Sequence, residues 1–197
     1  MTTFVTADQH FSHKTIIQYS SRPFSSIEAH DEALITAWNH TVSGHDTVYH
    51  LGDFTLGIKK NARSLFARLN GNIKVLANPW HHDSYWLESE MNLTIPYDYG
   101  ISKSGEIVSV ELPIIMLEGV IKIEGAKHNL PIVMCHYTFQ EWDRSHYGAV
   151  HFHGHSHGVL PKITNRLDVG VDHTCLLTGE YRPLELYESI GFSRMVQ

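Results

Sequence analysis

Residues 2–10, TTFVTADQH, join a short run of β-branched and aromatic residues to an aspartate and a histidine, Asp8 and His10. The same arrangement recurs along the chain, where strand-like runs at 46–52, 72–77, 130–135 and 149–154 precede further polar residues. These are Asp53, Asn78, His136, His155 and His157. Each run has the length and composition of a strand. Each of the five predicted strands therefore ends at a side chain that can bind a metal or take part in catalysis.

Helical patterns separate the first three of these strands. In residues 25–42, apolar side chains recur on one helical face, and Ser25 with Glu28 forms a predicted capping box. Residues 58–69 repeat the spacing, and Gly71 marks the stop. Alternating strands and helices predict an α/β fold with parallel strands, whose carboxyl ends gather ligands at one edge. We therefore expect the polar residues to converge in space.

The pattern changes between residues 85 and 129. Short alternating runs with turn signals at Ser104-Gly105 and Glu124-Gly125 predict antiparallel hairpin strands that extend a sheet. The tail, from residue 165 to residue 190, predicts one more strand and a closing element.

Length and composition narrow the function classes. A chain of 197 residues suits a single domain spanning residues 1–197. The formal charge of -6 gives no global reason to expect tight binding to duplex nucleic acid. The sequence has no signal-peptide pattern and no apolar run of membrane-spanning length, so we expect a cytoplasmic protein without membrane partners. Cys135 and Cys175 are expected to be reduced.

The donor types point to metal chemistry. Histidine, aspartate and asparagine without thiolates suit manganese, iron, zinc or nickel, and they disfavour structural zinc and calcium. The seven candidate ligands exceed one tetrahedral shell, so they suit two divalent ions that share a carboxylate. They are Asp8, His10, Asp53, Asn78, His136, His155 and His157. Such a pair retains roughly one net positive charge, which favours an anionic substrate such as a phosphate ester.

Five motifs carry a family resemblance. DQH at 8–10, LGD at 51–53, Asn78 after a strand, CH at 135–136 and GHSH at 154–157 resemble the ordered motifs of the calcineurin-like metallophosphoesterase superfamily. The segments RPF, YHLGDF and DVGVD resemble its small single-domain bacterial and phage members. The resemblance implies a four-layer α/β/β/α sandwich with mixed sheets. It also implies hydrolysis of phosphodiesters, with monoesters as a second substrate class, by in-line attack of a hydroxide that bridges two metal ions.

The resemblance also implies a division of the ligands and a class of partner. Asp8, His10 and His157 would hold one ion, Asn78, His136 and His155 the other, and Asp53 would bridge them. Manganese is the metal expected to support activity. A small phosphate ester or nucleotide is the expected partner, while nucleic acid is not favoured and the oligomeric state is left open.

The third motif departs from the family pattern. That pattern reads G-N-H-D or G-N-H-E, with a histidine that contacts the phosphate and protonates the leaving oxygen. Here residues 76–83 read LANPWHHD, so Pro79 and Trp80 separate Asn78 from the first histidine. Either His82, which keeps an HD pair with Asp83, or His81 takes the acid role. If neither does, the chain would bind metal with weak catalysis.

Other residues remain open between a functional and a structural role. Arg22 and Arg144 are candidates for contacting a phosphate oxygen, although surface arginines are common. His151 and His153 fall within a predicted strand, so we expect a structural or orienting role for them rather than metal binding. Two further functions compete with hydrolysis: a metal-holding module or scaffold with weakened catalysis, and a nuclease or nucleic-acid processing subunit.

Overall fold

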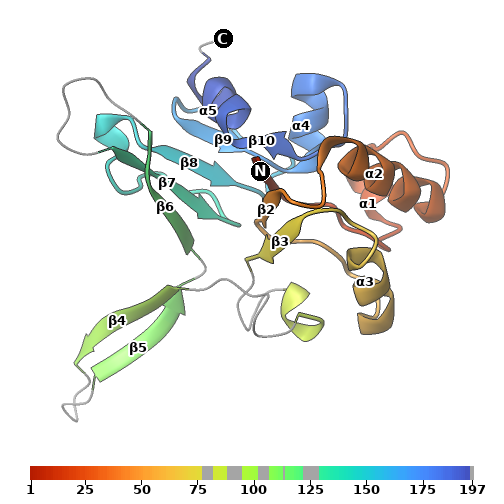
Figure 1. Ribbon diagram of the computed structural model, residues 1–197, viewed down its shortest axis with the longest axis horizontal. Coiled ribbons are helices and arrows are strands. Elements are labelled where there is room, and N and C mark those ends of the chain that lie inside the picture. Colours follow the sequence, from red (N-terminus) through yellow and green to blue (C-terminus); the bar gives the residue numbers. More distant parts are fainter. Residues whose placement is uncertain (77–81, 88–94, 102–106, 113, 122–128, 196–197) are drawn as a thin grey trace.

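The computed structural model describes residues 1–76, 82–87, 95–101, 107–112, 114–121 and 129–195. Its centre is a pair of four-stranded mixed sheets (Figure 1). In the first sheet, β1 (Thr3–Thr6), β2 (Thr47–His50) and β3 (Asn72–Val75) are parallel, and β10 (Leu184–Glu185) is antiparallel to β1. In the second, β7 (Leu130–Cys135), β8 (Val150–His153) and β9 (Arg166–Asp168) are parallel, and β6 (Ile114–Ile121) is antiparallel to β7. The predicted α/β class is confirmed.

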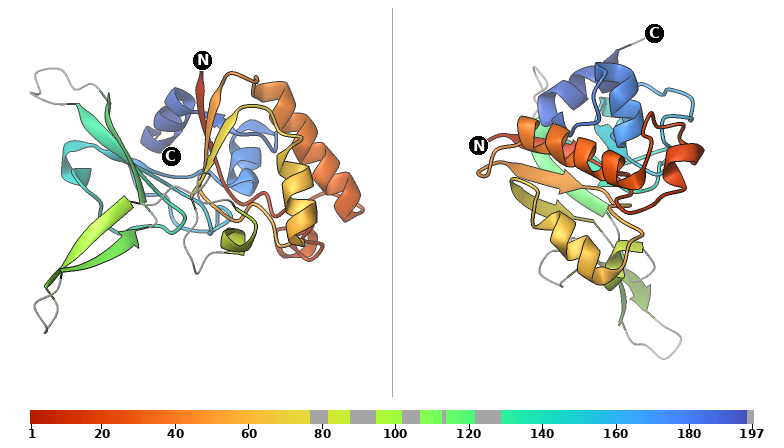
Figure 2. Two further views of the ribbon diagram at one scale, coloured as in Figure 1. Left: turned by 60° about the horizontal axis from the view of Figure 1, so that its bottom comes forward. Right: turned by 90° about the vertical axis from the view of Figure 1, so that its right-hand side faces the viewer.

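The described residues form five α-helices. They are α1 (Ile16–Tyr19), α2 (Ile27–Thr41), α3 (Lys59–Phe66), α4 (Val171–Thr178) and α5 (Leu186–Arg194). Helices α2 and α3 lie on the side of the first sheet that faces away from the second sheet (Figure 2). The predicted cap of α2 is wrong by one residue, because the hydroxyl of Ser26, not Ser25, accepts the backbone N–H of Ala29.

The first sheet is buried on both faces because its residues alternate between two hydrophobic cores. Phe4 and Val48 pack with Trp38 of α2 in one core. Val5 belongs to the other core, which also contains Ile132 of β7 and joins the two sheets. Burial on both faces is typical of parallel sheets with helical crossovers. In the second sheet, all six residues of β7 are buried, which agrees with its nearly continuous apolar run.

The antiparallel strands only partly follow the prediction. β6 extends the second sheet, as expected, but β4 (Ile95–Ile101) and β5 (Ile107–Leu112) form a separate two-stranded sheet that projects away from the others (Figure 1). The alternating pattern predicts strands but not the sheet they join.

The tail holds two strands and two helices, more than predicted, because a two-residue strand such as β10 leaves no periodic signal. Within the described ranges, no helix has the length and apolarity needed to cross a membrane.

Candidate metal centre

The loops that follow β1, β2, β7 and β8 meet at the carboxyl ends of their strands. Backbone hydrogen bonds join Asp8 to Gly52 and His10 to Asp53, both at 3.0 Å. Between the sheets, the backbone N–H of His155 donates to both carboxylate oxygens of Asp8 at 3.1 and 2.9 Å. The backbone N–H of Gly154 donates to the carbonyl of His136, after β7, at 3.0 Å, so these four loops lie together as predicted.

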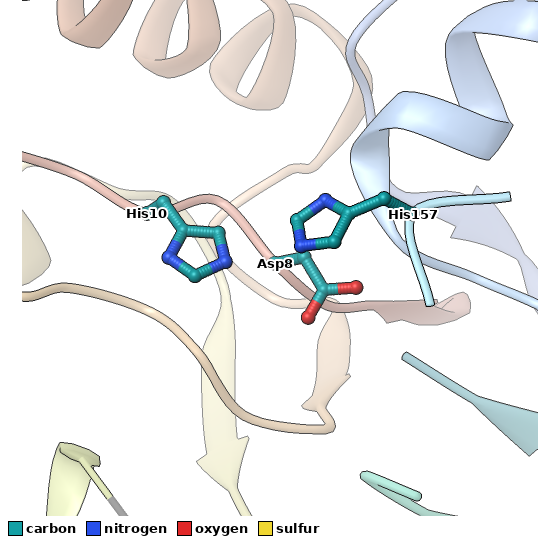
Figure 3. A group of neighbouring side chains, drawn as sticks. All are labelled: Asp8, His10 and His157. Atoms are coloured by element: carbon teal, nitrogen blue, oxygen red, sulfur yellow. The ribbon is translucent and has the colours of Figure 1, made fainter. Parts of the chain in front are cut away.

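One cluster of donors consists of Asp8, His10 and His157, whose candidate ligand atoms lie within 4.8 Å of one another (Figure 3). His10 is 6% exposed, and its Nε2 has no hydrogen-bond partner among the residues that the structure describes. A buried polar atom left without a partner is unfavourable, so it calls for an explanation. A divalent ion held by the three side chains would satisfy this nitrogen, and the donor set suits such an ion.

The second cluster consists of Asp53, His136 and His155, whose candidate ligand atoms again lie within 4.8 Å of one another. Asp53 also lies beside the first cluster. Its Oδ2 atom is 3.5 Å from Nε2 of His10 and 3.5 Å from Nε2 of His136. The carboxylate therefore lies between the two histidines, as a ligand shared by two neighbouring ions would need to.

The backbone at these candidate ligands is conformationally strained. Asp8, His10, Asp53, His155 and His157 all have positive φ, between 48° and 66°. They are five of the nine non-glycine residues with positive φ in the described chain. Such conformations are unfavourable for residues with a Cβ, and they concentrate at functional sites because the surrounding structure must hold them.

Two glycines allow the Asp8 carboxylate to be buried. A Cβ on Gly170 would lie 2.4 Å from Oδ2 of Asp8, and one on Gly154 would lie 3.0 Å from both of its carboxylate oxygens. Burial raises the pKa of Asp8 well above its usual value, and the charges of Asp168 and Asp53 raise it further. Bound cations would offset this concentration of negative charge.

A layer of charged residues behind the first cluster orients His157. Oδ2 of Asp172 lies 2.6 Å from Nδ1 of His157, which leaves Nε2 as the candidate ligand atom. The Nε and Nη2 atoms of Arg22 each donate to an oxygen of Asp172 at 2.8 Å. Nη2 also donates to the carbonyl of Asp8 at 2.7 Å, and Nη1 donates to that of Gln9 at 2.8 Å. Arg22 thus ties Asp172 to the loop that carries the candidate ligands Asp8 and His10.

This arrangement corrects the prediction for Arg22. The sequence makes Arg22 a candidate for contacting a substrate phosphate, but the residue is 3% exposed and all three guanidinium nitrogens donate within the protein. Asp172 was missed, although it lies in the motif-like segment DVGVD. The available signal was its place in the first turn of α4, directly after a strand that borders the site.

The third motif is only partly described. Asn78 and His81 lie outside the described residues. His82 is exposed and begins a 3₁₀ helix (His82–Tyr85). Burial lowers the pKa of His13, and the nearby charges of Arg22 and His82 lower it further.

Asp83, the next residue, is fully buried. It accepts the backbone N–H groups of Phe54 and Thr55 at 3.0 and 3.3 Å and the indole N–H of Trp86 at 2.8 Å. The carboxylate of the HD pair therefore holds the loop that follows Asp53, and it places His82 beside that loop.

The remaining candidates lie around this centre. Arg144 is exposed, and its Nε is 3.8 Å from Oδ2 of Asp143, so its contact with substrate stays a prediction. His151 is buried with a structural role, since its Nδ1 is 3.0 Å from the Val133 carbonyl and its Nε2 accepts the N–H of Phe139 at 3.1 Å. His153 shares its side of β8, with ring centroids 5.5 Å apart.

Fold and site together define an α/β protein with two adjoining histidine and aspartate clusters between mixed sheets. No protein-family model matches the chain. An uncharacterized protein of Methanocaldococcus jannaschii is 40% identical over 84 residues, which are 42% of this chain and 47% of that protein, so the match spans about half of the relative. The crystal structure of a protein of unknown function from Aquifex aeolicus matches with a TM-score of 0.57 and 15% identity, over 95% of this chain and 96% of that one. At that identity, the likeness concerns the fold alone.

Proposed function

We propose that this chain is a metal-dependent phosphoric ester hydrolase of the calcineurin-like type, acting on phosphodiesters ahead of monoesters. The observation that carries the proposal is the place of Asp53, whose Oδ2 lies 3.5 Å from a histidine of each cluster. We also propose that the two sheets and their helices form the four-layer α/β/β/α arrangement of that superfamily. The paired mixed sheets and the helices outside the first sheet support this arrangement.

The described residues divide between two ions. Asp8, His10 and His157 would hold one, His136 and His155 the other, and Asp53 would contribute to both. Manganese, iron, zinc and nickel suit these nitrogen and oxygen donors. Bound there, two divalent ions would lower the pKa of a water molecule and offset the negative charge of a phosphoryl transition state.

The chain's own side chains would complete the site. Asp172 holds Nδ1 of His157, so it fixes the ring orientation and leaves Nε2 free to bind. The exposed His82 lies beside the loop that carries Asp53, where it can give a proton to a leaving oxygen. Because His155 is exposed, one side of the centre is open to a substrate.

The test is hydrolysis of bis(p-nitrophenyl) phosphate and p-nitrophenyl phosphate by the purified protein with added manganese. We expect turnover of the diester, loss of at least about 100-fold in Asp53→Asn, and wild-type rates in Glu180→Gln, a matched carboxylate-to-amide change at an exposed position. Metal retention without turnover of either ester would favour a metal-holding module. No turnover with any of the four metals would refute the hydrolase.

A further inference from the structure

A cavity of about 240 Å³ lies behind the loop that carries His155 and His157. Its wall includes Ser156, between those two residues, and Leu177 of α4 with Phe192 of α5. None of the residues assigned to the metal centre lines it. The cavity is therefore a separate feature, which shares one loop with the centre.

The charge of Arg166 is the reason to expect a ligand there. Arg166 lines the cavity and is 8% exposed. Its Nη2 donates to the Pro161 carbonyl at 2.7 Å, and its Nη1 to the Phe139 carbonyl at 3.4 Å. In the part of the chain that the structure describes, no carboxylate lies within ion-pair distance of this guanidinium. A largely buried cation without a counter-charge is unfavourable, and an anion would relieve it.

The carboxylate that shares the cavity is already engaged elsewhere. Oδ1 of Asp168 accepts the backbone N–H of Gly170 at 2.8 Å. Oδ2 accepts the hydroxyl of Ser156 at 2.6 Å and the N–H of Gly158 at 2.8 Å. Asp168 therefore holds the loop that carries His155 and His157 instead of neutralising Arg166. Its charge also disfavours a doubly charged ligand nearby.

We propose that this cavity binds a small organic monoanion, with a carboxylate on Arg166 and an apolar body against Leu177 and Phe192. A guanidinium fork matches the two oxygens of a carboxylate. Lys162, exposed at the cavity wall, adds positive charge at its edge. The volume lies below the roughly 300 to 1,000 Å³ of sites for larger ligands, so the ligand is small.

The test is calorimetric titration of the full chain with 3-methylbutanoate, with the neutral 3-methylbutanamide and inorganic phosphate as matched probes. Each titration is run on the protein as purified, and the tryptophan variants described next separate binding in the cavity from binding to a metal ion. We expect 3-methylbutanoate to bind at least about 10-fold more tightly than the amide, since only the anion pairs with Arg166. Tighter binding of phosphate would overturn the assignment of the head group.

Variants on one helix locate the binding. Leu177→Trp fills the cavity and should weaken 3-methylbutanoate binding at least about 10-fold. Leu176→Trp, on the adjacent residue that is 77% exposed, should leave it unchanged. Arg166→Gln should also weaken binding. Because Arg166 donates to two backbone carbonyls, Arg166→Gln can misfold, and the comparison of Leu177→Trp with Leu176→Trp then decides the test. Absence of binding at millimolar concentration, or equal binding by the two tryptophan variants, would refute the site.

Discussion

Asp172→Asn tests whether the charged layer behind the first cluster sets metal affinity. The carboxylate accepts from Nδ1 of His157 at 2.6 Å and from Nε and Nη2 of Arg22 at 2.8 Å each. Asparagine keeps the size but replaces one accepting oxygen with an amide that donates. In either orientation the amide loses a hydrogen bond from Arg22, and when its nitrogen replaces Oδ2 it also loses the contact that orients His157.

The expected effect is confined to one of the two clusters. Changes to a residue that orients a metal ligand typically reduce affinity by about 10- to 100-fold, or roughly 1.4 to 2.7 kcal/mol. Asp172 contacts His157, which belongs to the cluster Asp8, His10 and His157, and its carboxylate also accepts from Arg22. One ion should therefore bind more weakly, and the other should bind as in the wild type.

Calorimetric titration with manganese measures the affinity of each ion, and metal analysis after gel filtration measures how many ions the protein retains. The titration is run well below the melting temperature, because loss of a buried ion-pair partner also destabilises the fold by about 3 to 5 kcal/mol. Asp143→Asn, the same change at an exposed position, is the control. A folded Asp172→Asn protein that binds two ions with wild-type affinity would refute this role for Asp172.

Three further outcomes are expected. His157→Ala should lose metal while His151→Ala keeps it, as metal analysis would show; equal loss in both would contradict the division between ligand and structural histidines. Gly170→Ala places a Cβ 2.4 Å from Oδ2 of Asp8, so the free energy of unfolding, measured by thermal unfolding, should fall by about 1 to 3 kcal/mol. Gly191→Ala, where a Cβ meets open space, should not destabilise the protein. Burial lowers the pKa of His151 from 6.5 to about 4, so the unfolded state alone takes up this proton as the pH falls from 6.5 to 4. This residue should therefore lower the free energy of unfolding by up to about 3 kcal/mol as the pH falls across that window. In urea titrations, the free energy of unfolding of His151→Gln should depend less steeply on pH than that of the wild type. An unchanged pH dependence would contradict this role of His151.

The site could be predicted where its signals are local. Asp8, Asp53 and His136 each follow a strand whose apolar run is readable in the sequence, and the topology of parallel strands brings strand ends together. The spacing of the four histidines in residues 151–157 suggests one cluster, but β8 ends at His153, so the buried pair in the strand is separated from the candidate ligands His155 and His157.

The residues that support the ligands could not be predicted in the same way. Arg22 and Asp172 are 150 positions apart, and neither lies in a periodic pattern that indicates a partner. Their pairing follows from the packing of the loop after β1 against the start of α4, so the sequence allowed a surface role for Arg22 that the structure excludes. The separate sheet of β4 and β5 was missed for a related reason, since alternation predicts a strand but not its neighbours.

Crystals grown with manganese and measured at its absorption edge would test the two-ion centre most directly. We expect two anomalous peaks, one within bonding distance of Asp8, His10 and His157 and the other of His136 and His155, with Asp53 contacting both. A single peak, or peaks away from these side chains at saturating manganese, would contradict the account.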